Sequence, residues 1–208
     1  MTRYDGPLYV EICPRTFSIL ARPGDRLVQA RFRAGGRQAE RELTVSVDLK
    51  GNGHGPIGYR ARRHAGLIDL NRVGGHDPSI YWEPIPAGDG RLVLDPGEFY
   101  ILASREAVEI PLNEAAEMAP IAPEIGEFRA HYAGFFDPGF GVESIGGAGG
   151  RAVLEVRGHD VPFILEHGQP VAKLVFEPMT DLPDRPYGSA GSHYQAQHLK
   201  LAKHFKMI

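Results

Sequence analysis

Apolar and polar residues alternate along much of the chain. Between residues 42 and 49 the apolar side chains Leu43, Val45, Val47 and Leu49 fall on one face of an extended segment, and polar residues separate them. A period of two is typical of a strand with one buried face. Similar short runs predict further strands at residues 8–12, 91–94, 99–103, 107–110, 152–156 and 172–176.

Helical periodicity is scarce in the same sequence. The candidates are residues 111–118, where Leu112, Ala115 and Ala116 share a face, and the end of the chain. The 26 glycines and 17 prolines favour short strands joined by turns, because both residue types are poorly tolerated inside helices. The pattern therefore predicts an all-β fold with little helix.

Composition excludes several classes of protein. A chain of 208 residues is long enough to form one large domain, or one domain and a fragment. Its net charge of -3 argues against bulk nucleic-acid binding. No apolar run approaches the roughly 20 residues of a membrane-spanning helix, so we expect no membrane partner. The lone cysteine, Cys13, excludes an intrachain disulfide framework and any cysteine-rich zinc cluster. A reducing compartment, the cytoplasm, is the expected location.

The chain contains a weak internal repeat. Residues 6–33 align without a gap on residues 150–177, which places Glu11 on Glu155 and Gly24 on Gly168. Each copy has the pattern of a strand with one glutamate, a second strand, a glycine turn and a third strand, although any two strand-turn-strand units can look alike. A duplication predicts that residues 1–35 are the last strands of a truncated first copy. Residues 36–208 then form a complete domain, with a C-terminal tail from about residue 180.

One carboxylate stands in an apolar strand. Over residues 151–156 the pleat sends Val153 and Glu155 to one face and Ala152, Leu154 and Val156 to the other. Burial raises the pKa of such a carboxyl group toward neutrality, which suits a general base. An exposed glutamate on an edge strand is the alternative interpretation.

Several short motifs follow one another in a characteristic order along residues 42–199. They are Leu94-Asp95-Pro96-Gly97, Val108-Glu109-Ile110-Pro111-Leu112, Phe136-Asp137-Pro138-Gly139-Phe140, Val153-Leu154-Glu155-Val156 and Leu174-Val175-Phe176-Glu177-Pro178. In this order the chain resembles the dCTP deaminases of the dUTPase-like superfamily. Residues 6–12 resemble the same glutamate-bearing strand in a preceding copy, which matches a duplicated form of that family.

This resemblance implies a fold, an activity and an assembly. The fold would be a dUTPase-like distorted β-barrel or jelly roll, and the assembly a homotrimer or pseudo-trimer around a threefold axis. The activity would be hydrolytic deamination of dCTP to dUTP and ammonia. Mg²⁺ would enter through the nucleotide triphosphate. Zinc is not expected, because zinc deaminases need a Pro-Cys-x-x-Cys motif that one cysteine cannot supply.

The resemblance also assigns roles to residues. Glu155 matches the general base that activates water, and Asp137 matches a residue near the deoxyribose 3′-hydroxyl. The backbone of Val153 and Leu154 would face the base. Tyr187, His193 and Gln197 match tail positions that contact the triphosphate and sugar, and the further candidates are Glu11, Arg129, Tyr194 and Lys200.

One motif departs from the family pattern. The family has a phosphate-binding motif, Ser-Ser-x-Gly-Arg, shortly before the Asp-Pro-Gly turn. Residues 122–129 of this chain read APEIGEFR, and only Gly126 and Arg129 match the motif. Two alternatives therefore stay open. One is a dUTP pyrophosphatase in which Asp137 positions water, and the other is a non-catalytic partner domain that binds nucleotide or completes trimers.

Overall fold

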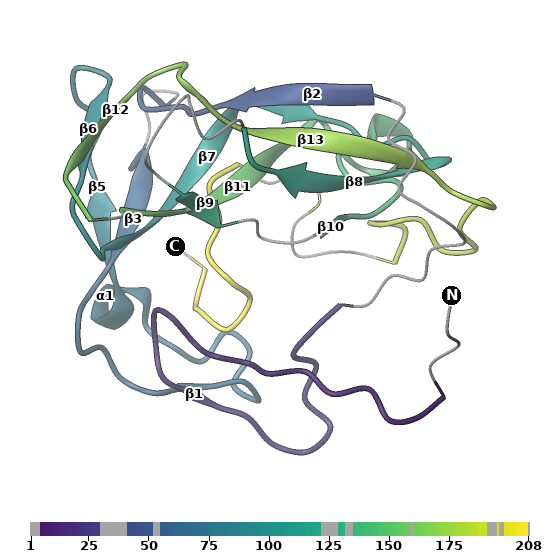
Figure 1. The fold of residues 1–208 in the computed structure, drawn as a ribbon, viewed down its shortest axis with the longest axis horizontal. Coiled ribbons are helices and arrows are strands. Elements are labelled where there is room, and N and C mark those ends of the chain that lie inside the picture. Colours follow the sequence, from purple (N-terminus) through teal and green to yellow (C-terminus); the bar gives the residue numbers. More distant parts are fainter. Residues whose placement is uncertain are drawn as a thin grey trace.

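The regular secondary structure consists almost entirely of β-strands (Figure 1). This computed structural model describes residues 5–29, 41–51, 55–121, 129–131, 135–158, 160–190, 195 and 198–207. The prediction of an all-β chain with little helix is confirmed. Within these residues no helix is long and apolar enough to cross a membrane.

Two antiparallel sheets form the body of the molecule. The smaller has the strand order β10-β8-β13-β2, from Phe135–Phe136, Glu114–Ala119, Pro170–Pro178 and Arg41–Ser46. The larger has the order β5-β3-β7-β11-β9, from Trp82–Ile85, Gly58–Ala61, Phe99–Val108, Gly150–Arg157 and Arg129–His131. Strand β11 lies between β7 and β9 and pairs with both of them. Its side chains alternate between the two faces of the larger sheet.

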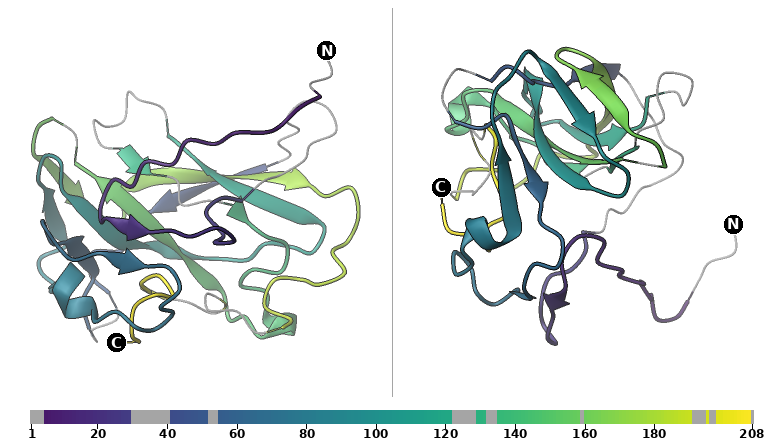
Figure 2. Two further views of the ribbon diagram at one scale, coloured as in Figure 1. Left: turned by 90° about the horizontal axis from the view of Figure 1, so that it is seen from below. Right: turned by 90° about the vertical axis from the view of Figure 1, so that its left-hand side faces the viewer.

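Shorter elements surround the two sheets. Strands β6 (Arg91–Leu94) and β12 (Phe163–Glu166) form a separate antiparallel pair, and β1 (Ile19–Leu20) pairs in parallel with β4 (Ile68–Asp69). Helix α1 (Pro78–Tyr81) is a single turn capped by the Asp77 side chain, and a 3-10 turn covers Glu143–Ile145. Two further views show that the N-terminal segment and β1 lie outside the paired sheets (Figure 2).

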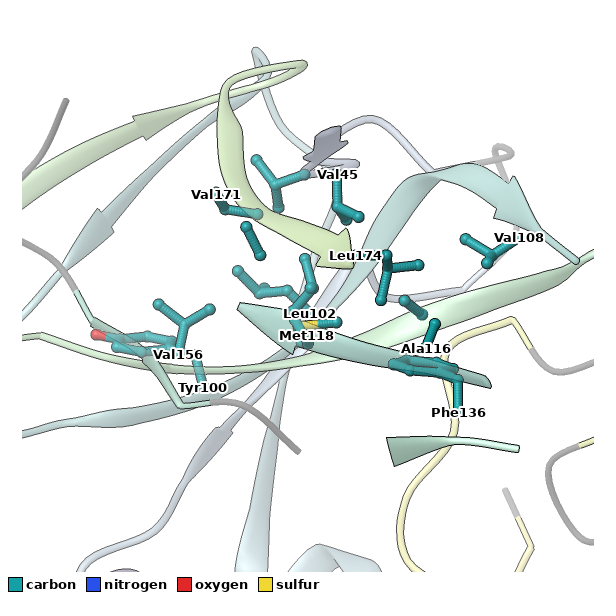
Figure 3. Packing of buried hydrophobic residues seen from close by; sticks show 14 of the residues in the cluster. Val45, Tyr100, Leu102, Val108, Ala116, Met118, Phe136, Val156, Val171 and Leu174 are labelled. Carbon is teal, nitrogen blue, oxygen red and sulfur yellow. The ribbon is translucent and has the colours of Figure 1, made fainter. Parts of the chain in front are cut away.

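The main core fills the space between the two sheets. Side chains from both sheets meet there, among them Val45, Leu102, Met118 and Leu174 (Figure 3). Leu154 and Val156 of β11 join this cluster and are fully buried, whereas Val153 and Glu155 lie on the opposite face. The predicted alternation of β11 is therefore confirmed, as is the buried face formed by Val45, Val47 and Leu49.

The helix predicted at residues 111–118 is wrong. Glu114–Ala119 forms strand β8, which pairs with β10 on one side and with β13 on the other. Ala115 and Ala116 are adjacent and both buried, so the segment is covered on both faces, as a central strand is. The described end of the chain, residues 198–207, is not helical either.

The strands predicted near the N-terminus are also wrong. Residues 8–12 are not in a strand, and Leu8 and Tyr9 are 83% and 88% exposed. A strand needs a neighbour to satisfy its backbone groups, and within the described part of residues 6–33 only Ile19–Leu20 has one. Residues 99–103 and 107–108, predicted in separate strands, belong to the one continuous strand β7, which ends at Val108.

A second apolar cluster lies on the other face of the larger sheet. It contains Tyr59, Tyr81, Trp82, Ile101 and Phe205, so residues near the C-terminus pack against β3, α1, β5 and β7. Phe17 of the N-terminal segment packs edge-on against Tyr81 and Trp82, with ring centroids 5.3 and 5.0 Å apart. This cluster brings both ends of the chain to the face that carries Glu155.

Candidate active site

A cavity of about 670 Å³ opens on the Glu155 face of the larger sheet. Its volume lies within the usual range for small-molecule sites. The walls come from segments that are distant in sequence: the N-terminal segment, β5, β7, the turn after β10, β11 and the C-terminal residues. The lining includes Ile12, Pro14, Arg15, Thr16, Phe17, Ile19, Trp82, Phe99, Phe135, Asp137, Val153, Glu155, Arg157, Tyr187, Lys200 and Phe205.

Glu155 is held in this cavity by strand pairing on both sides. Its register partners are Ile101 of β7 and His131 of β9, and the pleat points its carboxyl group toward the cavity. The side chain is half-buried, and burial raises its pKa above the ordinary value. Among the described residues it has no hydrogen bond or ion pair, so its oxygens can accept from a bound water or substrate.

Asp137 enters the cavity from a tight turn. The N–H of Phe140 donates to the Asp137 carbonyl at 3.1 Å, and Gly139 has a φ of 99°, a region that favours glycine. Strand β10 ends at Phe136, directly before this turn. The Asp137 carboxylate accepts a hydrogen bond of 3.2 Å from Nε2 of Gln29, so the N-terminal segment reaches this wall.

Tyr187 lies against the same turn. Its backbone N–H donates to the carbonyl of Pro138 at 2.8 Å, and its ring packs near that of Phe140, with centroids 5.8 Å apart. A Cβ on Gly139 would come within 3.0 Å of the Tyr187 carbonyl oxygen. Two predicted site residues, Asp137 and Tyr187, are thus brought to one wall.

The other predicted residues that the structure describes with their side chains lie in different places. Val153 and Lys200 line the cavity with Glu155. Leu154 is fully buried between the sheets, so it can face a ligand only through its backbone, as the prediction stated. Glu11, the equivalent of Glu155 in the repeat, is exposed and does not line the cavity.

Sequence comparisons identify the family. Residues 22–205 match the profile of the 2'-deoxycytidine 5'-triphosphate deaminase C-terminal domain, and residues 1–36 match the N-terminal domain of the same enzyme. The chain belongs to the dCTP deaminase family. The predicted resemblance is therefore confirmed, whereas the boundary proposed near residue 35 stays a prediction.

Two curated dCTP deaminases illustrate the relationship. The "dCTP deaminase, dUMP-forming" of Halobacterium salinarum is 32% identical over 141 residues, covering 65% of this chain and 67% of that protein. The enzyme of the same name from Streptomyces coelicolor is 29% identical over 151 residues, covering 68% and 75%.

A solved dCTP deaminase shares the fold. The crystal structure of 2'-deoxycytidine 5'-triphosphate deaminase from Agrobacterium tumefaciens is 55% identical, with a TM-score of 0.63 over 68% of this chain. The match covers 42% of the Agrobacterium chain, so this chain spans less than half of that protein's length.

Part of the predicted dCTP deaminase site lies outside the described residues. This applies to His193, Tyr194 and Gln197, and to residues 122–128, which depart from the phosphate motif. Arg129 is the first residue of β9, next to β11, but only its backbone is described.

Sequence reasoning missed two arginines of the cavity. Arg157 follows Glu155 by two residues on the same face of β11, and Arg15 belongs to the N-terminal segment. The spacing of Arg157 was a usable signal, because alternate residues of a strand share a face. Arg15 and the aromatic wall formed by Phe17, Trp82 and Phe205 belong to no motif.

The cavity offers few ligands for a metal ion. Asp137 and Glu155 are its lining carboxylates, and the described residues contain no group of three or more His, Cys, Asp or Glu side chains placed to hold a metal. A divalent cation in this cavity would take oxygen ligands mainly from water and a bound phosphate chain.

Proposed function

We propose that this chain catalyses the hydrolytic deamination of dCTP, with Glu155 as the general base. The observation that carries the proposal is a half-buried carboxyl group of raised pKa inside a nucleotide-sized cavity, on the strand where the dCTP deaminase family motif places it. Asp137, Tyr187, Val153 and Lys200 line the same cavity.

The proposed chemistry is a balanced addition and elimination. The Glu155 carboxylate accepts a proton from water as the water oxygen bonds to C4 of cytosine. Glu155 then passes the proton to the exocyclic nitrogen, the C4–N bond breaks and ammonia leaves. The hydroxyl proton that remains on C4 moves to N3, which gives the C4 carbonyl and the N3–H of uracil. The net reaction converts dCTP and water into dUTP and ammonia, and a pKa raised toward neutrality suits both directions of this proton transfer.

The proposal places the substrate against named residues of the cavity wall. Asp137 accepts a hydrogen bond from the deoxyribose 3′-hydroxyl, and the backbone of Val153 and Leu154 reads the cytosine edge. Tyr187 and Lys200 lie toward the sugar and phosphates. Mg²⁺ accompanies the triphosphate, because this hard cation prefers oxygen ligands and the described lining of the cavity offers two carboxylates, Asp137 and Glu155.

We also propose a homotrimeric or pseudo-trimeric assembly in the cytoplasm. The apolar side chains of Leu8, Tyr9 and Val10 are largely exposed, and a neighbouring copy could cover them. Cys13 is free and exposed, which suits a reducing compartment. Light scattering measures the assembly; a stable monomer over the working concentration range contradicts the trimer.

A second candidate activity adds loss of diphosphate. The relatives from Halobacterium and Streptomyces carry the description "dUMP-forming", so deamination in those proteins ends at the monophosphate. If this chain does the same, Asp137 is the cavity carboxylate available to position water at the α-phosphate.

The decisive experiment follows four possible products from dCTP with Mg²⁺. Ammonia is assayed enzymatically, and dUTP, dUMP and diphosphate are separated by anion-exchange chromatography. Ammonia with dUTP supports simple deamination, and ammonia with dUMP and diphosphate supports the second candidate. Incubation with dUTP alone tests pyrophosphatase activity without deamination.

Negative results also discriminate. Binding of dCTP without any product favours a non-catalytic partner domain. Absence of both binding and turnover contradicts the proposed function.

A further inference from the structure

Two arginines of the cavity lining, Arg15 and Arg157, are linked by a hydrogen bond. Arg157 donates from Nη2 to the carbonyl oxygen of Arg15 at 3.0 Å and to Oγ1 of Thr16 at 3.3 Å. Its Nη1 donates to the carbonyl of Gly97 at 3.1 Å. The Arg157 side chain therefore fastens the N-terminal segment to the larger sheet.

Arg157 contacts the backbone carbonyl of Arg15, so the Arg15 guanidinium group takes no part in this hydrogen bond. The Arg15 side chain is exposed, lines the cavity, and has no hydrogen bond or ion pair within the described part of the chain. A second anchor holds the same segment nearby, where Arg22 donates to both carboxylate oxygens of Asp69 at 2.5 and 3.0 Å. The guanidinium group of Arg15 is thus presented on a fixed backbone.

The positive charges of Arg15 and Arg157 lie close enough to repel each other. Burial and the charge of Arg15 both lower the pKa of Arg157. An anion beside Arg15 would relieve this repulsion, and guanidinium groups bind phosphate oxygens with charge-assisted hydrogen bonds. Lys200 adds a third basic residue to the lining.

Residues 122–129 supply no serine and two glutamates where the family motif has phosphate-binding groups. We propose that Arg15, from the N-terminal segment, binds the triphosphate of the substrate in the Glu155 cavity, and that Arg157 is the positioning residue that holds it there. This inference rests on the proposed function and names a residue that the family motifs do not contain.

The test compares ligands with and without phosphates. The full chain is titrated with dCTP, inorganic triphosphate and deoxycytidine, using the fluorescence of Trp82, the single tryptophan, which lines the cavity. The variants are Arg15→Gln and Arg15→Lys. Arg26→Gln is the matched control, because Arg26 is an exposed arginine of the same segment that does not line the cavity.

Arg15→Gln is expected to weaken binding of dCTP and of inorganic triphosphate by about tenfold or more, the effect of losing a charge-assisted contact. Arg15→Lys retains part of the affinity, and deoxycytidine binding stays within about twofold of the control. In kinetics, Arg15→Gln raises KM more than it lowers kcat.

Arg157→Lys tests the positioning role. It keeps the charge but loses the contacts to the Arg15 carbonyl and Thr16, so dCTP binding weakens. The loss is smaller in an Arg15→Gln background, because the two residues act through one contact. Independent, additive losses contradict the positioning role.

Two results overturn the inference. One is an Arg15→Gln variant that binds dCTP like Arg26→Gln; the other is equal weakening of deoxycytidine and dCTP, which indicates that the segment acts only as a structural cover. Failure of the proposed function looks different. In that case the unsubstituted chain binds inorganic triphosphate in an Arg15-dependent way but does not deaminate dCTP.

Discussion

The backbone N–H of Tyr187 donates a hydrogen bond of 2.8 Å to the carbonyl oxygen of Pro138. This bond joins the closing segment of the chain to the turn that carries Asp137. Gln195 reinforces the junction by donating from Nε2 to the Gly139 carbonyl at 3.1 Å. Because the bonds involve the turn backbone, the position of the tail depends on the conformation of Gly139.

Gly139→Ala is expected to detach the tail from this turn. The alanine would occupy a positive φ and would place Cβ 2.8 Å from the Ile145 side chain and 3.0 Å from the Tyr187 carbonyl. Gly146→Ala is the control, because its φ is also positive but its Cβ meets nothing within 4 Å. Both variants carry backbone strain of about 1–3 kcal/mol. Urea denaturation should show the larger loss for Gly139→Ala, with a raised KM; equal losses would contradict the role of the contact.

Glu155→Gln should abolish ammonia release while dCTP still binds. The amide keeps the size of the side chain but cannot accept the proton of water. The control is Glu109→Gln, because Glu109 is exposed and does not line the cavity. Single-turnover ammonia assays and dCTP titrations measure the two effects. Persistence of ammonia release in Glu155→Gln would remove Glu155 from the role of general base.

The pH dependence of stability should identify the same carboxyl group. Burial raises the pKa of Glu155 above its ordinary value of 4.5, so the folded state holds this proton more tightly than the unfolded state. Stability is therefore lost as pH rises from the unfolded pKa through the folded pKa. Glu155→Gln removes this loss. Its Tm relative to the unsubstituted chain should increase between low pH and neutral pH, and a difference that does not vary with pH would contradict the shift.

Neighbouring residues of β11 should separate stability from activity. Leu154 is fully buried between the sheets, so Leu154→Ala should lower the free energy of unfolding by about 2–5 kcal/mol. Val153 lines the cavity, so Val153→Ala should cost less stability and change KM for dCTP more. Denaturation curves and steady-state kinetics on both variants check the assignment. A larger stability loss for Val153→Ala and a larger change in KM for Leu154→Ala would contradict the assignment of Leu154 to the core and Val153 to the cavity.

Acid should loosen the N-terminal segment. Arg22 lowers the pKa of the Asp69 carboxyl group from 3.8 to about 2, so the contact is complete above pH 3.8 and is lost as pH falls through about 2. Hydrogen exchange of the Ile68 amide, which donates to the Ser18 carbonyl at 2.9 Å, reports the opening. Asp69→Asn should raise this exchange rate at neutral pH. Asp89→Asn, at an exposed aspartate that accepts from the backbone N–H of Arg91, should leave it unchanged.

Local patterns predicted the strands whose two faces differ. The alternation around Val45 and in β11 is visible in sequence, because one face of each strand meets the core and the other does not. Strand β8 was mistaken for a helix, since Ala115 and Ala116 are buried on opposite faces and leave no period of two. Residues 8–12 alternate like a strand, but periodicity carries no information about the partner that a strand requires.

The candidate site was predictable only where a motif marked it. Glu155, Asp137 and Tyr187 stand in short family motifs, and the structure brings them to one cavity. Arg15 and Phe17 belong to a segment more than a hundred residues away from β11. Their contribution depends on tertiary packing, which no local pattern encodes.

The hydrogen bonds from Arg157 to Arg15 and Thr16 matter for the choice of a shortened version of this protein. The profile of the C-terminal domain begins at residue 22, yet Ile12, Arg15, Phe17 and Ile19 lie before that point and line the cavity. A protein shortened to the profile boundary would keep Glu155 and lose the wall that faces it. The smallest piece suited to ligand screening therefore begins before Ile12, and an inactive fragment starting at residue 22 would say little about the catalytic strand.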